Sequence, residues 1–131
     1  MSAHRVLRDL LAAFSDVGPG RVAIAATSIG VALEENKLIQ FVVPTWGNAN
    51  NILILPSPQP GKIVIIAGAA TGGELRSSSP TTVAINGGTG VDAESAVAAN
   101  ELVIAICESS VSWKAFTIAS NGTTAGLEAA A

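Results

Sequence analysis

The stretch that decides the fold is NILILPSPQPGKIVII, residues 51–66. It contains an apolar run, a proline-rich corner and a second apolar run. Both runs are short and rich in β-branched residues, a pattern typical of buried strands. Pro56, Pro58 and Pro60 cannot donate hydrogen bonds to a sheet, and Gly61 permits a turn. We therefore expect two central strands that the corner holds at a fixed angle, and no catalytic motif lies within them.

Outside this stretch, short apolar segments are separated by turn residues. Strands are expected at 38–43 and 81–85, and Asn86-Gly87-Gly88 is a strong tight-turn signal. Residues 102–118 predict a hairpin whose second strand anchors the core through Trp113 with Phe116. No long helices alternate with the strands, as a parallel α/β sheet requires. The sequence therefore predicts an all-β fold, an antiparallel β-sandwich or barrel, with a short N-terminal helical or extended arm.

The first residues carry the clearest helical pattern. Val6, Leu10 and Phe14 recur at four-residue spacing over residues 3–14, and Gly18-Pro19-Gly20 ends the pattern. A helix this short is marginal alone, so its apolar stripe needs a surface to pack on. That surface belongs either to its own β body or to a neighbouring subunit.

Three segments follow from these patterns: an N-terminal arm at 1–20, a β domain at 21–118 and a C-terminal tail at 119–131. The tail is expected to be loosely held unless a partner orders it. Trp46 stands at the edge of a loop, where it either covers one end of the core or contacts a neighbouring subunit. The residues that we consider as partner contacts are Arg5, Val6, Arg8, Leu10, Phe14 and Trp46.

The composition favours an assembled protein over a nucleic-acid binder. Hydrophobic residues make up 49% of the 131 residues and charged residues only 13%, about half the usual share. Either the surface is rich in uncharged polar residues, or part of it is buried against other subunits. The net charge of −3 argues against neutralising phosphates. No apolar run is long enough to predict a membrane-spanning helix.

The side chains that usually perform catalysis are scarce. The chain has one histidine, His4, no tyrosine and one cysteine, Cys107, which lies in an apolar run and is expected to be buried. The glycine-rich segments lack the strand–loop–helix setting of a phosphate-binding loop, and the carboxylates lack calcium-loop spacing. We therefore expect no enzymatic activity, no cofactor and no metal site.

A set of short strings resembles small bacteriophage virion proteins. They are the Pro60-Gly61-Lys62 corner, the segment 74–80, the Asn86-Gly87 turn and the strand around Trp113. Similar strings occur in phage capsid decoration (cement) proteins and in β modules of tail fibres. The resemblance covers residues 51–122.

The resemblance implies a small, non-enzymatic β fold that forms a homotrimer on the outer surface of the capsid. Such a protein is made in the host cytoplasm, binds neighbouring major capsid proteins after shell expansion and stabilises the shell by bridging them. Nucleic acid and membrane are not expected partners. A tail, fibre or neck module of the virion is an alternative, and a small-ligand or glycan-binding β module is an alternative of another class.

Overall fold

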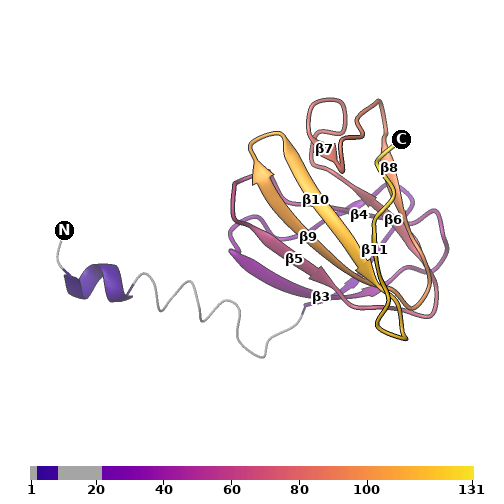
Figure 1. The fold of residues 1–131 in the computed structure, drawn as a ribbon, viewed down its shortest axis with the longest axis horizontal. Coiled ribbons are helices and arrows are strands. Elements are labelled where there is room, and N and C mark those ends of the chain that lie inside the picture. Colours follow the sequence, from indigo (N-terminus) through magenta and orange to yellow (C-terminus); the bar gives the residue numbers. More distant parts are fainter. Residues whose placement is uncertain (1–2, 9–21) are drawn as a thin grey trace.

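The computed structural model describes residues 3–8 and 22–131 (Figure 1). Residues 3–8 form a helix, and the rest of the described chain is strands joined by turns. The strands are β1 Val22–Ala25, β2 Val31–Ala32, β3 Ile39–Thr45, β4 Ile52–Ile54, β5 Ile63–Ile66, β6 Gly73–Arg76, β7 Ala84–Ile85, β8 Glu94–Val97, β9 Leu102–Ser109, β10 Ser112–Ile118 and β11 Thr124–Gly126.

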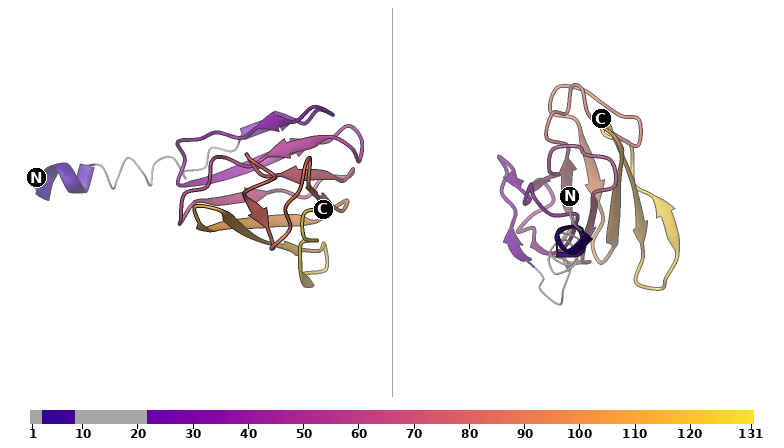
Figure 2. Two further views of the ribbon diagram at one scale, coloured as in Figure 1. Left: turned by 90° about the horizontal axis from the view of Figure 1, so that it is seen from above. Right: turned by 90° about the vertical axis from the view of Figure 1, so that its left-hand side faces the viewer.

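The strands form two mixed sheets and no closed barrel. The seven-stranded sheet, called sheet A, has the order β1-β3-β5-β9-β10-β11, with β7 paired to β10. The four-stranded sheet, called sheet B, has the order β2-β4-β6-β8. Figure 2 shows the sheets from two further sides. The β-rich class is confirmed, whereas the barrel expected as one option is not found.

The expectation of antiparallel pairing is wrong for the first half of the body. β1, β3 and β5 pair in parallel, as do β2, β4 and β6, and paired residues lie 20 to 24 positions apart in the sequence. The chain alternates between the sheets from β1 to β6, so each crossover is a strand of the opposite sheet. A parallel pair needs a crossover of a dozen or more residues, and here a strand supplies it instead of a helix.

Residues 51–66 lie where the chain crosses from sheet B to sheet A. We call the alternating path from β1 to β6 the winding. Its first apolar run forms β4 in sheet B, and its second forms β5 in sheet A. The corner bends through Gly61, whose φ of 95° is favourable only for glycine. Lys62 and Cys107 pair through their backbones beside it, which joins the corner to β9. The two expected strands are confirmed, and they belong to different sheets.

Antiparallel pairing begins after the winding. β5 pairs with β9, and β9 pairs with β10 in the predicted hairpin. Trp113 is fully buried, as expected, whereas Phe116 is partly exposed on the other side of β10, because successive side chains of a strand alternate between its faces. Asn86 and Gly87 both have positive φ, 51° and 88°, which gives the tight turn that their sequence predicts.

The C-terminal tail is part of the body, which corrects the expectation that it is loosely held. β11 pairs with β10, and Leu127 is buried in the core. Beyond it, the Ala130 N–H donates to the carbonyl of Ile85 in sheet A, and Ala131 exchanges two backbone hydrogen bonds with Glu94 in sheet B. The tail therefore links the edges of the two sheets.

One hydrophobic core unites the two sheets. It contains alternate residues of the strands in both sheets, as the period of two requires. Within residues 3–8 and 22–131, no helix is long and apolar enough to cross a membrane. The largest fully buried side chains of the core are Trp46, Trp113, Leu53, Leu55, Ile66 and Leu75.

Candidate interaction surface

The outer face of sheet A carries rows of large apolar side chains. The register places Phe41 beside Ile65, Ile65 beside Ile104 and Ile104 beside Phe116, so one row crosses four strands. The members of this row are all partly exposed. We call the whole set the apolar face, and it consists of Ile39, Phe41, Val43, Ile63, Ile65, Leu102, Ile104, Ile106, Phe116 and Ile118.

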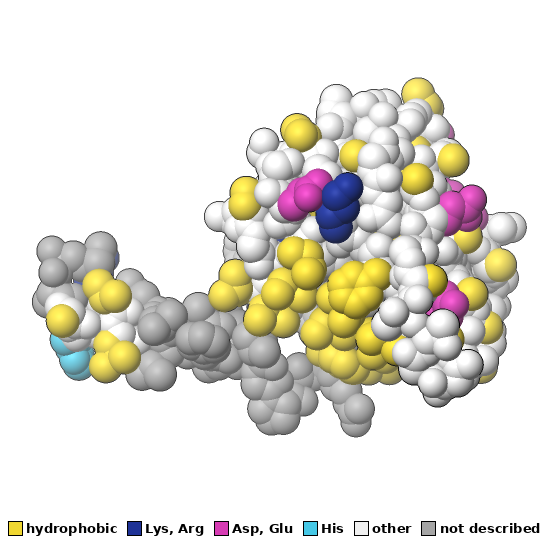
Figure 3. Space-filling view, viewed as in Figure 1, with side chains coloured by type: hydrophobic (Ala, Val, Ile, Leu, Met, Phe, Trp, Pro, Cys, Tyr) yellow, Lys and Arg dark blue, Asp and Glu magenta, His cyan; other side chains and the backbone are white. Residues whose placement is uncertain are grey.

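The apolar face covers a continuous area. Four strands spaced by about 4.8 Å, and rows repeating about every 6.8 Å, give roughly 14 Å by 14 Å between Cα positions and roughly 400 Å² with the marginal side chains. Hydrophobic side chains gather over β3, β5, β9 and β10 in Figure 3. Among the described residues of this face, the charged side chains are Lys114 and Glu108, which lie 3.7 Å apart at one end of β9 and β10. A patch of this size is typical of an interaction site.

Sheet B provides a contrast within the same molecule. Its outer positions on β6 and β8 are held by Glu74, Arg76 and Glu94, whereas the inner residues Leu75 and Ser95 are buried. This is the apolar-in, polar-out alternation of a sheet with one solvated face. In sheet A, β5 and most of β9 instead read as continuous apolar runs, which is typical of strands covered on both faces.

The predicted contact residues of the arm lie outside the body. Arg5, Val6 and Arg8 belong to the helix at 3–8, and every residue of that helix is exposed. Val6 is 49% exposed. Leu10 and Phe14 lie outside the described residues. The structure therefore leaves the apolar side chains of this helix open to a partner.

Trp46 is placed in the core rather than on the surface. It follows β3 and is 2% exposed. A Cβ on Gly73 would overlap its indole ring, so β6 can approach the ring only because residue 73 is glycine. Of the two interpretations of Trp46, covering one end of the core describes it, and its side chain is not accessible for contact with another subunit.

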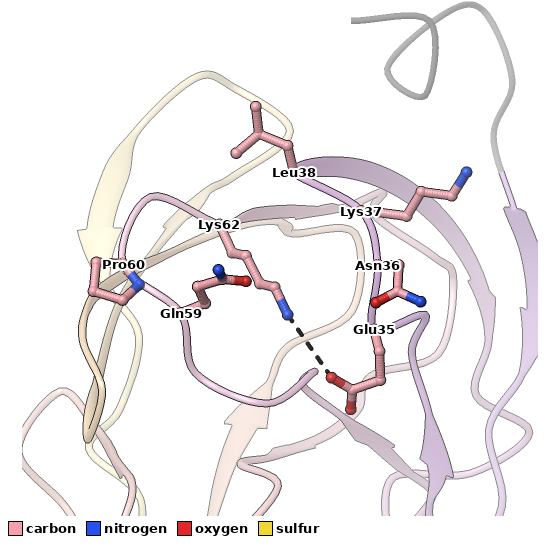
Figure 4. Close-up of a pocket in the computed structure, with 7 residues that line it drawn as sticks. All are labelled: Glu35, Asn36, Lys37, Leu38, Gln59, Pro60 and Lys62. Carbon is pink, nitrogen blue, oxygen red and sulfur yellow. Dashed lines mark ion pairs between the residues drawn. The ribbon is translucent and has the colours of Figure 1, made fainter. Parts of the chain in front are cut away.

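A polar pocket lies beside the proline corner (Figure 4). It has a volume of about 350 Å³ and lies between the 35–38 turn and the 59–62 corner. The Lys62 ammonium is 3.8 Å from the Glu35 carboxylate and donates to the Ser57 carbonyl at 3.1 Å. Both Glu35 oxygens accept from the Ser57 N–H, at 2.9 and 3.1 Å.

These contacts hold the structure around the pocket together. The buried ammonium of Lys62 is compensated by a carboxylate and a carbonyl, so the pair ties the turn to the corner. Cys107 lies nearby and donates from Sγ to the Ser109 carbonyl at 3.1 Å. Burial raises the pKa of the Cys107 thiol, against opposing hydrogen bonds and the charge of Lys62. The thiol is therefore protonated and poorly nucleophilic at neutral pH.

A second charged group occupies the outer face of sheet B. Arg76 forms an ion pair with Glu94 and lies 3.6 Å from Asp92. A hydrogen bond with Glu94, together with burial and the negative charge of Glu94, raises the pKa of Glu74 to about 7. Glu74 is therefore partly protonated near pH 7, which makes the charge of this surface depend on pH.

The described ranges offer no ready metal site, because no three His, Cys, Asp or Glu side chains gather where they could hold an ion. Comparison with known proteins adds no relative: no family model, no curated protein and no solved structure matches the chain.

The apolar face was missed by sequence reasoning that looked for contacts in the arm and loops. Its signal was present in the unbroken apolar runs 63–66 and 102–106. These runs indicate strands covered on both faces, and the described residues cover only one face of sheet A. Among the described residues, the helix at 3–8 and the apolar face are therefore the two apolar surfaces without a covering layer.

Proposed function

We propose that this chain is a structural subunit of a phage virion that decorates the assembled capsid. It forms a homotrimer on the outer surface of the shell, where it bridges neighbouring major capsid proteins. The observation that carries the proposal is the apolar face of sheet A. A chain with such a surface and 13% charged residues is suited to permanent assembly.

Stabilisation by linkage is the mechanism that we propose. A protein that binds the assembled shell and not its free subunits stabilises the shell by mass action. Three linked copies raise the effective concentration of each contact, so weak individual contacts become a strong attachment. This mechanism needs neither catalysis nor a cofactor, in keeping with the structural roles of Lys62 and Cys107.

A tail, fibre or neck module is the second candidate. The parallel winding from β1 to β6 favours it, because coils that place strands alternately in two sheets can be stacked end to end. The short length of the winding favours the decoration role instead. A particle reconstruction separates the two, since the density for this chain would lie on the shell in one case and on the tail in the other.

Cosedimentation with expanded shells tests the decoration role directly. We expect the full chain to pellet with expanded shells and not with unexpanded precursors. Deleting residues 1–20 should weaken shell binding while the β body remains folded by circular dichroism. Equal binding to both shell forms, or density confined to the tail, would contradict the proposal.

A further inference from the structure

We propose that the apolar face is covered by the N-terminal segment, residues 3–14, of a second copy of this chain. Both surfaces are open in a single chain: Val6 and Leu7 of the helix are 49% and 55% exposed, and Ile106 of the face is 38% exposed. When two copies exchange their N-terminal segments, the apolar side chains of the segment and those of the apolar face are buried in the same contact.

The dimensions of the segment fit the face. The helical pattern that the sequence predicts over residues 3–14 corresponds, at 1.5 Å per residue, to about 18 Å of helix about 10 Å wide. This length spans the roughly 14 Å of the apolar face and leaves side chains to pack over its margins. The stripe of Val6 and Leu7 continues in the sequence at Leu10, Leu11 and Phe14. An apolar helix on an apolar sheet face completes a layered core.

The N-terminal segment is joined to the body close to the apolar face. The chain enters the body at Val22, and β1 pairs with β3, whose residues Phe41 and Val43 belong to the apolar face. The arm therefore departs from the edge of the same sheet. Glu101 directly precedes β9, Glu108 lies near the other end of β9 beside Lys114, and the segment carries Arg5 and Arg8. Opposite charges at the rim favour docking and set its orientation.

Area favours the exchange over contact between two apolar faces alone. A standard interface buries about 800 Å² on each partner, and the apolar face supplies roughly 400 Å². Adding the stripe of the segment brings the buried area of each copy closer to the standard value. In a closed ring, every face receives one segment and every segment has one face, which matches the cyclic symmetry of a homotrimer.

Cysteine pairs distinguish exchange between copies from packing within one copy. Leu7→Cys and Ile65→Cys chains are mixed in equal amounts and oxidised, with native Cys107 buried in both. We expect a disulfide-linked heterodimer, identified by mass spectrometry of the Leu7→Cys and Ile65→Cys peptides. The control mixture contains Leu7→Cys and Ile29→Cys, because Ile29 is 86% exposed outside the apolar face, and it should give at least tenfold less heterodimer.

A chain that carries both Leu7→Cys and Ile65→Cys tests whether the segment packs on the apolar face of its own copy. An intrachain disulfide that forms at all protein concentrations, without covalent dimers, would show that the segment covers its own face and would overturn the exchange. Equal yields in the test and control mixtures would also overturn it, because they would reflect random collision.

Sedimentation velocity then tests the energetics in purified protein. Ile65→Lys should weaken self-association at least tenfold, Leu7→Glu should do the same, and Ile29→Lys should leave it unchanged. Oligomers that survive Leu7→Glu but dissociate with Ile65→Lys would identify face-to-face contact and reject the segment as occupant. These measurements contain no shells, so failure to bind a capsid would remove the proposed function and leave the exchange intact.

Discussion

The side chain of Asn86 joins the tight turn to β10 and to the tail, and its replacement tests how the tail is held. Its Nδ2 donates to the carbonyls of Ala115 and Leu127 at 2.9 and 2.7 Å. Its Oδ1 accepts from the Ala115 N–H at 2.9 Å. The residue also has a φ of 51°, in the left-handed region that asparagine tolerates better than most residues.

The expected loss for Asn86→Ala is about 4 kcal/mol of unfolding free energy. Three partly buried hydrogen bonds contribute about 1 kcal/mol each, and alanine in the left-handed region costs about 1 kcal/mol more. Asn86→Gly keeps the backbone conformation and removes only the bonds, so it should cost about 3 kcal/mol. Asn100→Ala places alanine at a φ of 62° on an exposed side chain, so it should cost about 1 kcal/mol.

Equilibrium urea unfolding measures these differences. The fluorescence of the buried Trp46 and Trp113 reports the transition, and the protein concentration is held fixed because self-association would shift the midpoint. Asn86→Gly within about 0.5 kcal/mol of the wild type would refute the reasoning, because the three bonds would then contribute nothing to stability. A large loss for Asn100→Ala alone would assign the effect to backbone strain.

Three further results are expected from the core and the charged surface. Trp113→Ala should cost about 3–5 kcal/mol in urea unfolding, and Trp113→Phe markedly less, because the indole N–H finds no hydrogen-bond partner among the described residues. Leu127→Ala should cost about 2–4 kcal/mol, whereas Leu38→Ala, at a side chain 44% exposed, should cost under about 1 kcal/mol; equal losses would place the tail outside the core. The folded pKa of Glu74 is about 7 against 4.5 for an ordinary glutamate, so the folded state binds more protons between these values and stability should fall as pH rises from about 4.5 to 7. Glu74→Gln should remove about 1 kcal/mol of this fall in stability, measured as unfolding free energy from pH 4.5 to 8, and an unchanged pH profile would contradict the raised pKa of Glu74.

Local structure could be predicted from the sequence because it depends on neighbouring residues. The runs at 51–55 and 62–66 became β4 and β5, and the hairpin of β9 and β10 formed with Trp113 inward. These features follow from apolar periodicity and turn residues, which a short window contains. The positive φ of Asn86 and Gly87 follows from the same local chemistry.

The direction of strand pairing could not be predicted, because it is set by distant residues. Val22 pairs with Val42 across an intervening strand of the other sheet, and nothing in either segment records whether the neighbour runs parallel. We inferred antiparallel pairing from the lack of long helices, but a strand can serve as the crossover. The tail was missed for a related reason: backbone hydrogen bonds and the Asn86 amide hold Ala130 and Leu127, and composition does not reveal them.

The low charge of the chain and the apolar face of sheet A are one feature. If an uncharged polar surface alone explained the 13% of charged residues, the outer positions of β3, β5, β9 and β10 would hold serine, threonine or asparagine. Most of them hold isoleucine, phenylalanine, valine or leucine instead, and the polar exceptions are Thr45, Glu108, Ser112 and Lys114. The outer positions of β6 and β8 include Glu74, Arg76 and Glu94. Charge is therefore missing mainly from the face that we expect to be covered. A sheet with one solvated face needs polar residues there, so their scarcity on the outer face of sheet A favours a working state in which another layer lies on it.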